Sequence, residues 1–136
     1  MKTYILDTSV ACAWYLNEKI ATAARNWQQR LINNEISIIV PSLHYWEFGN
    51  VLRTYVRRGE LATNLAYEIY QLHLEAPLKL AEPNNLAVLH RALDYQATMY
   101  DAVYIELAFS HKAPLITAER STTAWVTKMG KLVHAL

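Results

Sequence analysis

Four acidic side chains in this sequence stand beside motifs that could bring them together. They are Asp7, Glu47, Asp101 and Glu119. Converging carboxylates repel one another, by roughly 4 kcal/mol for two unit charges about 4 Å apart at an effective dielectric near 20. A cation between them removes this cost, and oxygen ligands with few His or Cys favour Mg²⁺ or Mn²⁺. The four acids therefore predict a site for a hard divalent metal.

Asp7 and Asp101 also have ordinary structural explanations. Asp7 could cap the helix that follows it, but Thr8 and Ser9 beside it would serve as caps equally well. Asp101 could stabilise the start of its helix by about 0.3–1 kcal/mol. That helix is apolar around most of its circumference and is expected to be buried, which makes a purely surface role less natural. We interpret both acids as metal ligands, with Thr8 and Ser9 orienting the metal or a phosphate.

Glu47 is expected in the second turn of a helix over residues 43–58, where Asn50 shares its face. A solvated surface pair would explain both residues, but apolar neighbours such as Trp46 argue against it. Gly49 inside this helix costs about 1 kcal/mol relative to Ala, which is easier to understand where another group approaches the backbone closely. Glu47 is therefore interpreted as a ligand of the metal or of one of its waters, held by Asn50.

Glu119 and several neighbouring polar residues complete the predicted site. A surface ion pair between Glu119 and Arg120 is the alternative for this acid. Thr117 is expected to orient ligands, while Arg53 and Arg120 are candidates for contacts with phosphate. The net charge is +1, from 13 basic and 12 acidic residues, so without the four candidate ligands eight acids face 13 bases. This balance fits an acidic pocket with a basic rim that a polyanion can approach.

Other side chains that could do chemistry show no pattern of a site. The histidines lack the spacing of ligands and are expected at the surface or at its boundary: His44, His73, His90, His111 and His134. Cys12 is expected to pack in the apolar face of a helix, and the sequence has no glycine-rich phosphate loop and no nucleophile elbow. The four tryptophans are expected mostly in the core, although Trp46 could stack on a base.

Short apolar strands alternate with helices along the chain. Strands are expected at residues 3–6, 36–40, 78–81, 115–117 and 131–134. Helices are expected at residues 10–16, 21–33, 43–58, 62–75, 84–97, from 101 onward, and at 123–128. Ser42 is expected to cap the helix 43–58, and Gly59 to end it. The alternation predicts a parallel sheet with helices on both faces, and Asp7 and Glu119 follow strands at the edge where such sheets bind ligands.

Length and composition indicate one domain over residues 1–136. Apolar residues make up 53% of the chain, so a large core is expected and disorder is not. A single cysteine, Cys12, excludes an intramolecular disulfide and indicates a reducing compartment, the cytoplasm. The sequence has no run of about 18 apolar residues, and Met1–Tyr4 lacks the apolar stretch of a signal peptide, so no membrane association is expected.

Four short segments are informative through their order and spacing over nearly the whole chain. They are Ile5–Ser9, Glu47–Leu52, Tyr100–Ala108 and Leu115–Glu119. Together they resemble the PIN-domain nucleases, and within them the VapC-type toxins of prokaryotic toxin–antitoxin pairs. The resemblance implies a three-layer α/β/α fold with a central, mostly parallel sheet, and Mg²⁺- or Mn²⁺-dependent hydrolysis of RNA. Its acids correspond to Asp7, Glu47, Asp101 and Glu119, where Glu119 departs from the aspartate usual in the family.

The resemblance also implies an RNA substrate and a small antitoxin partner. The helices expected at 43–58 and 62–75 carry many apolar groups, so we expect a groove or a homodimer surface there that a partner helix uses. Ordinary core packing is the alternative for these groups. A PIN-like module that binds RNA or protein without cleaving is the alternative function. A receiver-type phospho-acceptor fits poorly, because Asp7 stands alone after the first strand and the third strand ends in Ala81-Glu82-Pro83.

Overall fold

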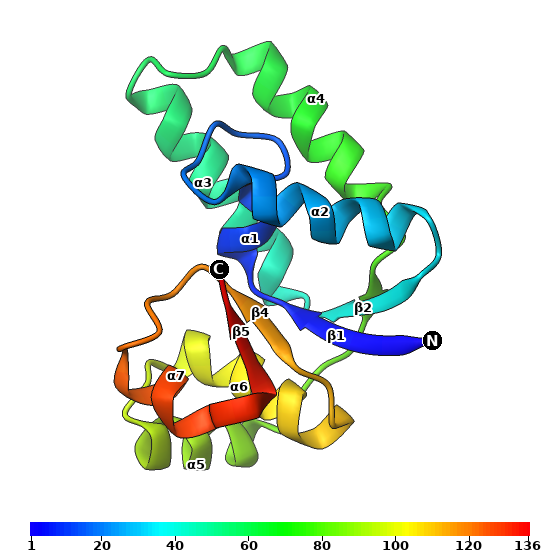
Figure 1. Ribbon diagram of the computed structural model, residues 1–136. Coiled ribbons are helices and arrows are strands. Elements are labelled where there is room, and N and C mark those ends of the chain that lie inside the picture. Colours follow the sequence, from blue (N-terminus) through cyan, green and yellow to red (C-terminus); the bar gives the residue numbers. More distant parts are fainter.

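A five-stranded parallel sheet lies at the centre of the computed structural model, which describes residues 1–136 (Figure 1). Its strands are β1 (Lys2–Leu6), β2 (Ile36–Val40), β3 (Lys79–Leu80), β4 (Leu115–Thr117) and β5 (Val133–Ala135). They lie in the order β3-β2-β1-β4-β5, and every neighbouring pair is parallel. The sequence-based prediction of a parallel sheet and of these five strands is confirmed.

Helices cover both faces of this sheet, as Figure 1 shows. On one face lie α1 (Thr8–Cys12), α2 (Ala21–Ile32), α3 (Leu43–Arg57) and α4 (Thr63–Leu74). On the other lie α5 (Asn85–Tyr95), α6 (Met99–His111) and α7 (Ala124–Met129), and a 3₁₀ turn over Gly130–Leu132 leads into β5. The predicted three-layer α/β/α fold is therefore confirmed. None of these helices combines the length and the apolar character that crossing a membrane requires.

Alternating side chains of the central strand explain why the sheet has a core on each face. Tyr4 and Leu6 of β1 pack in the cluster formed with α1 to α4, whereas Ile5 between them packs with α6 and α7. All three side chains are at most 5% exposed. A strand buried on both faces reads as a continuous apolar run, which is the pattern of a covered parallel sheet.

Two helices on the first face differ at their ends from the prediction. Helix α1 begins directly after Asp7 and ends at Cys12, where a helix over residues 10–16 was expected, because Asp7 already occupies its N-cap position. The Ser42 side chain does not cap α3; instead the Ser42 amide donates a hydrogen bond to Glu82 Oε1 at 2.7 Å. Both differences concern polar groups that found partners far away in the sequence.

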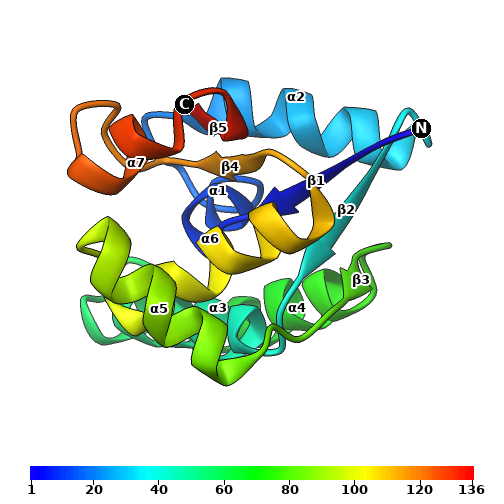
Figure 2. The same cartoon turned by 90° about the horizontal axis from the view of Figure 1, so that it is seen from below.

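Helix α6 begins two residues before the predicted start at Asp101. Thr98 takes the N-cap position, and its hydroxyl accepts a hydrogen bond from the Asp101 amide at 3.1 Å. Asp101 therefore lies in the first turn, where its negative charge is favoured by the helix dipole. The prediction that this helix is buried is confirmed, and Figure 2 shows it lying across β1 and β4.

The order of the strands singles out one place for a ligand. The chain builds β1, β2 and β3 outward in one direction and then returns to place β4 on the free side of β1. In open α/β sheets, ligands bind outside the carboxyl ends of the strands at such a point of reversal. Leu6 pairs with Ile116 here, so the residues that follow both strands emerge side by side.

Candidate active site

Asp7 leaves the end of β1 and is held by the neighbouring strand β4. Its amide donates to the Ile116 carbonyl oxygen at 3.0 Å, and its Oδ2 accepts a hydrogen bond from the Thr117 hydroxyl at 2.8 Å. Asp7 occupies the N-cap position of α1, but its side chain makes no capping hydrogen bond to that helix. Burial, with the charges of Asp101 and Glu47, raises the pKa of Asp7 to about 6, against the lowering effect of the hydrogen bond from Thr117.

Asp101 is the acid that interacts with all the others. Burial raises the pKa of Asp101, and the charges of Glu119 and Glu47 add to this rise, while the hydrogen bond to Thr98 opposes it. Because Asp101 also raises the pKa of Asp7, the four predicted acids share one region of negative potential. The structure therefore brings together residues from four separate segments of the chain.

The Glu47 carboxylate is held by two hydroxyl groups from other helices. Its Oε1 accepts a hydrogen bond from Thr8 at 3.0 Å and from Tyr104 at 2.7 Å. Asn50, which was expected to hold Glu47, is exposed and makes no side-chain hydrogen bond to it. Sequence reasoning missed Tyr104 in this role. The available signal was its position one helical turn after Asp101, because a buried tyrosine hydroxyl needs a hydrogen-bond partner.

Glu119 lies in the loop after β4 and organises that loop. Its Oε1 accepts hydrogen bonds from the Thr123 hydroxyl at 3.1 Å and from the Arg120 amide at 3.2 Å. The Arg120 side chain is exposed and forms no ion pair with Glu119, so the surface ion pair considered as an alternative is not formed. Glu119 is partly buried, and its negative charge raises the pKa of Asp101.

Two of the predicted hydroxyl groups connect β1 to this loop. Thr117 is fully buried, and its hydroxyl donates to Asp7 while accepting from the Glu119 amide at 3.1 Å. The Ser9 hydroxyl accepts a hydrogen bond from the Ala118 amide at 3.2 Å. These contacts fix the path of the chain that presents Asp7 and Glu119.

The four acids do not form a ready coordination shell. No three His, Cys, Asp or Glu side chains lie close enough together to hold a metal ion. Mutual repulsion separates carboxylates, and here Asp7, Glu47 and Glu119 are bound to hydroxyl groups instead. The chemistry of the donors nevertheless fits Mg²⁺ or Mn²⁺, since it consists of oxygen atoms in a negative, partly buried region.

Three aromatic side chains lie where the sequence did not place them. His44 and His73 were expected near the surface but are both 0% exposed. Trp46 was expected in the core with the other tryptophans but is 76% exposed, whereas Trp14 and Trp125 are buried. A helix exposes or buries each side chain according to its face, and the apolar residues of α3 outnumber the positions on its buried face.

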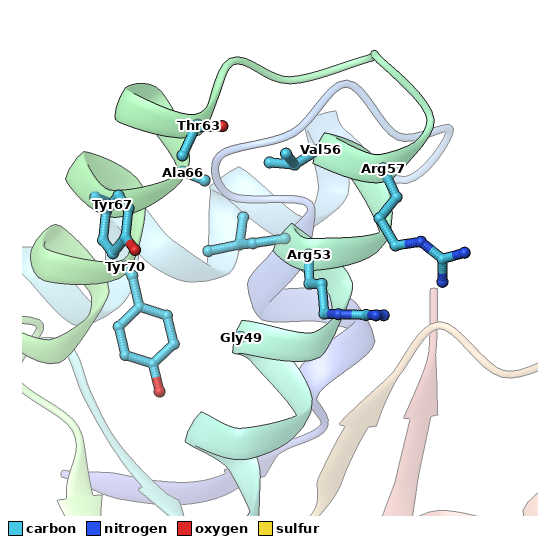
Figure 3. Close-up of a pocket in the computed structure, with 9 residues that line it drawn as sticks. Gly49, Arg53, Val56, Arg57, Thr63, Ala66, Tyr67 and Tyr70 are labelled. Atoms are coloured by element: carbon cyan, nitrogen blue, oxygen red, sulfur yellow. The ribbon is translucent and has the colours of Figure 1, made fainter.

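A groove of about 440 Å³ lies between α3 and α4 (Figure 3). Its lining residues are Gly49, Leu52, Arg53, Val56, Arg57, Thr63, Ala66, Tyr67 and Tyr70. A Cβ atom on Gly49 would lie 2.9 Å from Cε1 of Tyr70, so the close approach expected at this glycine comes from α4. Arg53 and Arg57 extend from α3 to the side away from Tyr67 and Tyr70. The predicted groove is present, and its occupant stays a prediction.

The fold and the site define an α/β protein with an acidic ligand site at the switch point of its sheet. Residues 4–122 match the PIN domain family, and the chain belongs to this family. PIN domains are generally metal-dependent nucleases. No curated protein sequence matches the chain significantly.

Two solved structures are similar in fold. The crystal structure of PAE2754 from Pyrobaculum aerophilum superimposes with a TM-score of 0.73 at 24% identity, covering 98% of this chain and 90% of that one. A toxin–antitoxin complex from Klebsiella pneumoniae superimposes with a TM-score of 0.58 at 13% identity, covering 97% of this chain and 96% of that one. At these identities, the likeness concerns the fold.

Replacement of Glu119 tests whether it belongs to the site. Glu119→Ala is expected to weaken Mn²⁺ affinity and to lower RNA cleavage by less than loss of Asp7 does, because the carboxylate of Glu119 is bound to Thr123 and adds negative charge near Asp101. Glu119→Asp is expected to stay active. Cleavage rates at increasing Mn²⁺ concentration compare the variants with the wild type. Superimposable curves for Glu119→Ala and wild type would remove Glu119 from the site and leave three carboxylates.

Proposed function

We propose that this chain is a Mg²⁺- or Mn²⁺-dependent endoribonuclease, the toxin of a type II toxin–antitoxin pair. One observation carries the nuclease proposal. At the switch point of the sheet, burial and the charges of Asp101 and Glu47 raise the pKa of Asp7, while burial and the charges of Glu119 and Glu47 raise that of Asp101. Keeping such groups ionised near neutral pH is costly without a cation, whereas packing alone would be served by neutral side chains.

Each predicted residue has a defined part in this proposal. Asp7 and Asp101 would hold the metal directly, and Glu47 would bind it or one of its waters. Thr117 orients Asp7 through their hydrogen bond at 2.8 Å, and Thr8 orients Glu47 at 3.0 Å. A bound Mg²⁺ or Mn²⁺ supplies the chemistry that lowers the pKa of a water and offsets negative charge on the scissile phosphate.

Three exposed side chains are available for contacts with RNA. Arg53 and Arg120 are exposed and free of ion pairs, so their guanidinium groups are available to phosphate oxygens. Trp46 precedes Glu47 and exposes most of its ring, which suits stacking on a base. In this proposal the two arginines contact the RNA backbone and Trp46 contacts the face of a base. Such contacts do not depend on which RNA is bound.

Cleavage of RNA by the purified chain is the direct test. Labelled RNA is incubated with protein and millimolar Mg²⁺ or Mn²⁺, and the products are resolved on a gel, with a chelator in a parallel reaction. Cleavage that requires the metal supports the proposal. Binding of RNA without cleavage at any metal concentration would favour the silent binding module instead.

The toxin part of the proposal concerns the groove between α3 and α4. Its wall carries apolar side chains of which some stay exposed, among them Tyr67 at 75%. An amphipathic helix of an antitoxin would bury this surface, and a homodimer formed over the same helices is the other assembly expected. The fold likeness to a chain from a toxin–antitoxin complex is consistent with a partner of this kind.

Tyr67→Glu is expected to weaken binding of the antitoxin at least tenfold, about 1.4 kcal/mol, because it places a charge in the apolar groove. The chain is co-expressed with the product of the neighbouring gene, and co-purification is followed by calorimetric titration. Leu86→Glu is the matched control, since Leu86 is 79% exposed on α5, outside the groove. A wild-type chain that stays monomeric and binds no neighbouring gene product would contradict the prediction.

A further inference from the structure

A continuous chain of polar side chains connects α4 to the candidate active site. The Tyr15 hydroxyl lies 3.0 Å from Nδ1 of His73, and Nε2 of His73 lies 2.8 Å from Nε2 of His44. On its other side, Nδ1 of His44 lies 3.2 Å from the Thr8 hydroxyl, which donates to Glu47. The two histidines and Thr8 are at most 5% exposed, so solvent cannot supply missing hydrogen bonds.

The contact between the two histidines restricts their protonation. Two Nε2 atoms 2.8 Å apart share a single proton, so one ring donates and the other accepts. Both rings are also neutral near pH 7, since burial lowers the pKa of His44 to about 3 and that of His73 to about 4. Each neutral ring carries one proton, so the tautomer of one histidine determines the tautomer of the other.

Only two arrangements of protons satisfy every hydrogen bond from Tyr15 through the two histidines to Thr8. In the first, Tyr15 donates to His73, Nε2 of His73 donates to His44, and Nδ1 of His44 donates to the Thr8 oxygen. The Thr8 proton is then free for Glu47. In the second, every bond is reversed and the Thr8 proton is used on His44, which leaves Glu47 without it.

Both ends of this hydrogen-bond chain favour the first arrangement of protons. At one end, Oε1 of Glu47 lies 3.0 Å from the Thr8 hydroxyl, and a carboxylate oxygen is a stronger acceptor than a neutral ring nitrogen. At the other end, Nδ1 of His73 is the only hydrogen-bond partner of the partly buried Tyr15 hydroxyl, so the first arrangement uses the Tyr15 proton and the second leaves it without an acceptor. Tyr104 also donates to Glu47 and lies 2.7 Å from the Thr8 hydroxyl, which places a second acceptor for the Thr8 proton on the same side.

We propose that His44 and His73 are positioning residues for Glu47, because the one-way chain from Tyr15 reserves the Thr8 proton for the Glu47–Tyr104 pair. The histidines touch neither substrate nor metal. They act through Thr8, which keeps the Glu47 carboxylate at a defined place beside Asp7 and Asp101. The consequence for metal binding rests on the proposed function, whereas the direction of the chain does not.

Nitrogen NMR spectra of the histidine rings test the direction. Long-range proton–nitrogen correlations of the ¹⁵N-labelled protein, prepared without metal near neutral pH, distinguish the two tautomers of a neutral ring. The proposal expects the proton of His44 on Nδ1 and that of His73 on Nε2. The opposite pair of tautomers, or a charged ring at either position, would overturn it.

Tyr15→Phe tests the effect on the site, since it removes only the donor at the start of the chain. The histidine tautomers are expected to mix or reverse, and Mn²⁺ affinity in calorimetric titration to fall about threefold to tenfold, less than the 10–100-fold typical of partners that touch a ligand directly. Tyr55→Phe is the matched control, because Tyr55 donates to Glu18 and neither residue belongs to the hydrogen-bond chain from Tyr15 to Glu47. It is expected to leave tautomers and affinity unchanged.

A conservative variant of His44 separates positioning from packing. His44→Asn keeps a donor near the place of Nδ1 and is expected to bind Mn²⁺ more tightly than His44→Leu, which has none. Equal affinity of Tyr15→Phe and wild type, with unchanged tautomers, would overturn the proposal. Absence of Mn²⁺ binding by the wild type would instead reject the proposed metal site, and the tautomers would still decide the direction of the chain.

Discussion

Asp7→Asn and Asp101→Asn are each expected to lower metal-dependent RNA cleavage by at least about 100-fold, because loss of groups that only orient a ligand already costs about 10–100-fold. Both substitutions remove a negative charge from the shared acidic region while keeping the shape of the side chain. Initial rates with saturating Mg²⁺ or Mn²⁺, compared with wild type, give the effect. Retention of full activity by either variant would reject the metal site.

Asp94→Asn is the matched control for these two variants. Asp94 is an exposed aspartate of α5 whose Oδ1 lies 3.1 Å from Lys128 Nζ, and the pair is about half exposed on both sides. Exposed pairs contribute roughly 0–1 kcal/mol, so neither folding nor cleavage is expected to change measurably. A loss of activity in this control would indicate that removing any acid impairs the protein.

Asp7→Asn is also expected to stabilise the protein in the absence of metal. The pKa of Asp7 rises from 3.8 to about 6 on folding, so the folded chain binds this proton more tightly than the unfolded chain does. The stability that Asp7 contributes is therefore present below about pH 4 and is lost as the pH rises through about 6. Urea unfolding over this range should show wild type losing stability relative to Asp7→Asn. Parallel curves would contradict the raised pKa.

Mn²⁺ is expected to raise the melting temperature of the wild type by roughly 10 °C at 100 times its dissociation constant. Binding to the native state alone stabilises it by about 2.7 kcal/mol at that concentration, and each kcal/mol shifts the melting temperature of a chain this size by about 3–4 °C. Scanning calorimetry with and without Mn²⁺ measures the shift, and Asp7→Asn serves as the control with a much smaller one.

Calcium provides a second comparison for the same experiment. Its coordination geometry is looser than that of Mg²⁺, so Ca²⁺ is expected to raise the melting temperature without supporting cleavage. A scan in which millimolar Mn²⁺ leaves the melting temperature of the wild type unchanged would contradict a site that exists before RNA binds.

Several features of the fold could be predicted from local patterns because their causes are local. Short apolar runs become strands of a sheet that is covered on both faces, and the alternation with helices makes that sheet parallel. Gly59 has a φ of 72°, which explains why α3 ends before it as predicted. The positions of Asp7 and Glu119 after neighbouring strands follow from the same argument, since parallel strands all end at one edge.

The partners of the acids could not be predicted in this way. Thr8 and Tyr104, which hold Glu47, are 39 and 57 residues away from it in the sequence, whereas Asn50 on its own helix turned outward. Helical periodicity identifies which residues share a face, but it does not identify what packs against that face. The preference for Asn50 therefore followed from sequence proximity alone.

The sequence by itself determined the α/β/α class, the family, and the set of acids that share one region. Only the tertiary structure decided how these acids are held, that they form no coordination shell by themselves, and that His44 and His73 are buried together. The physical reason is that strands and helices arise from contacts between near neighbours, whereas buried polar groups must find partners wherever the packed chain supplies them. The hydrogen-bond chain from Tyr15 to Glu47 joins residues 8–15 to α3 and α4, three segments that lie far apart in the sequence.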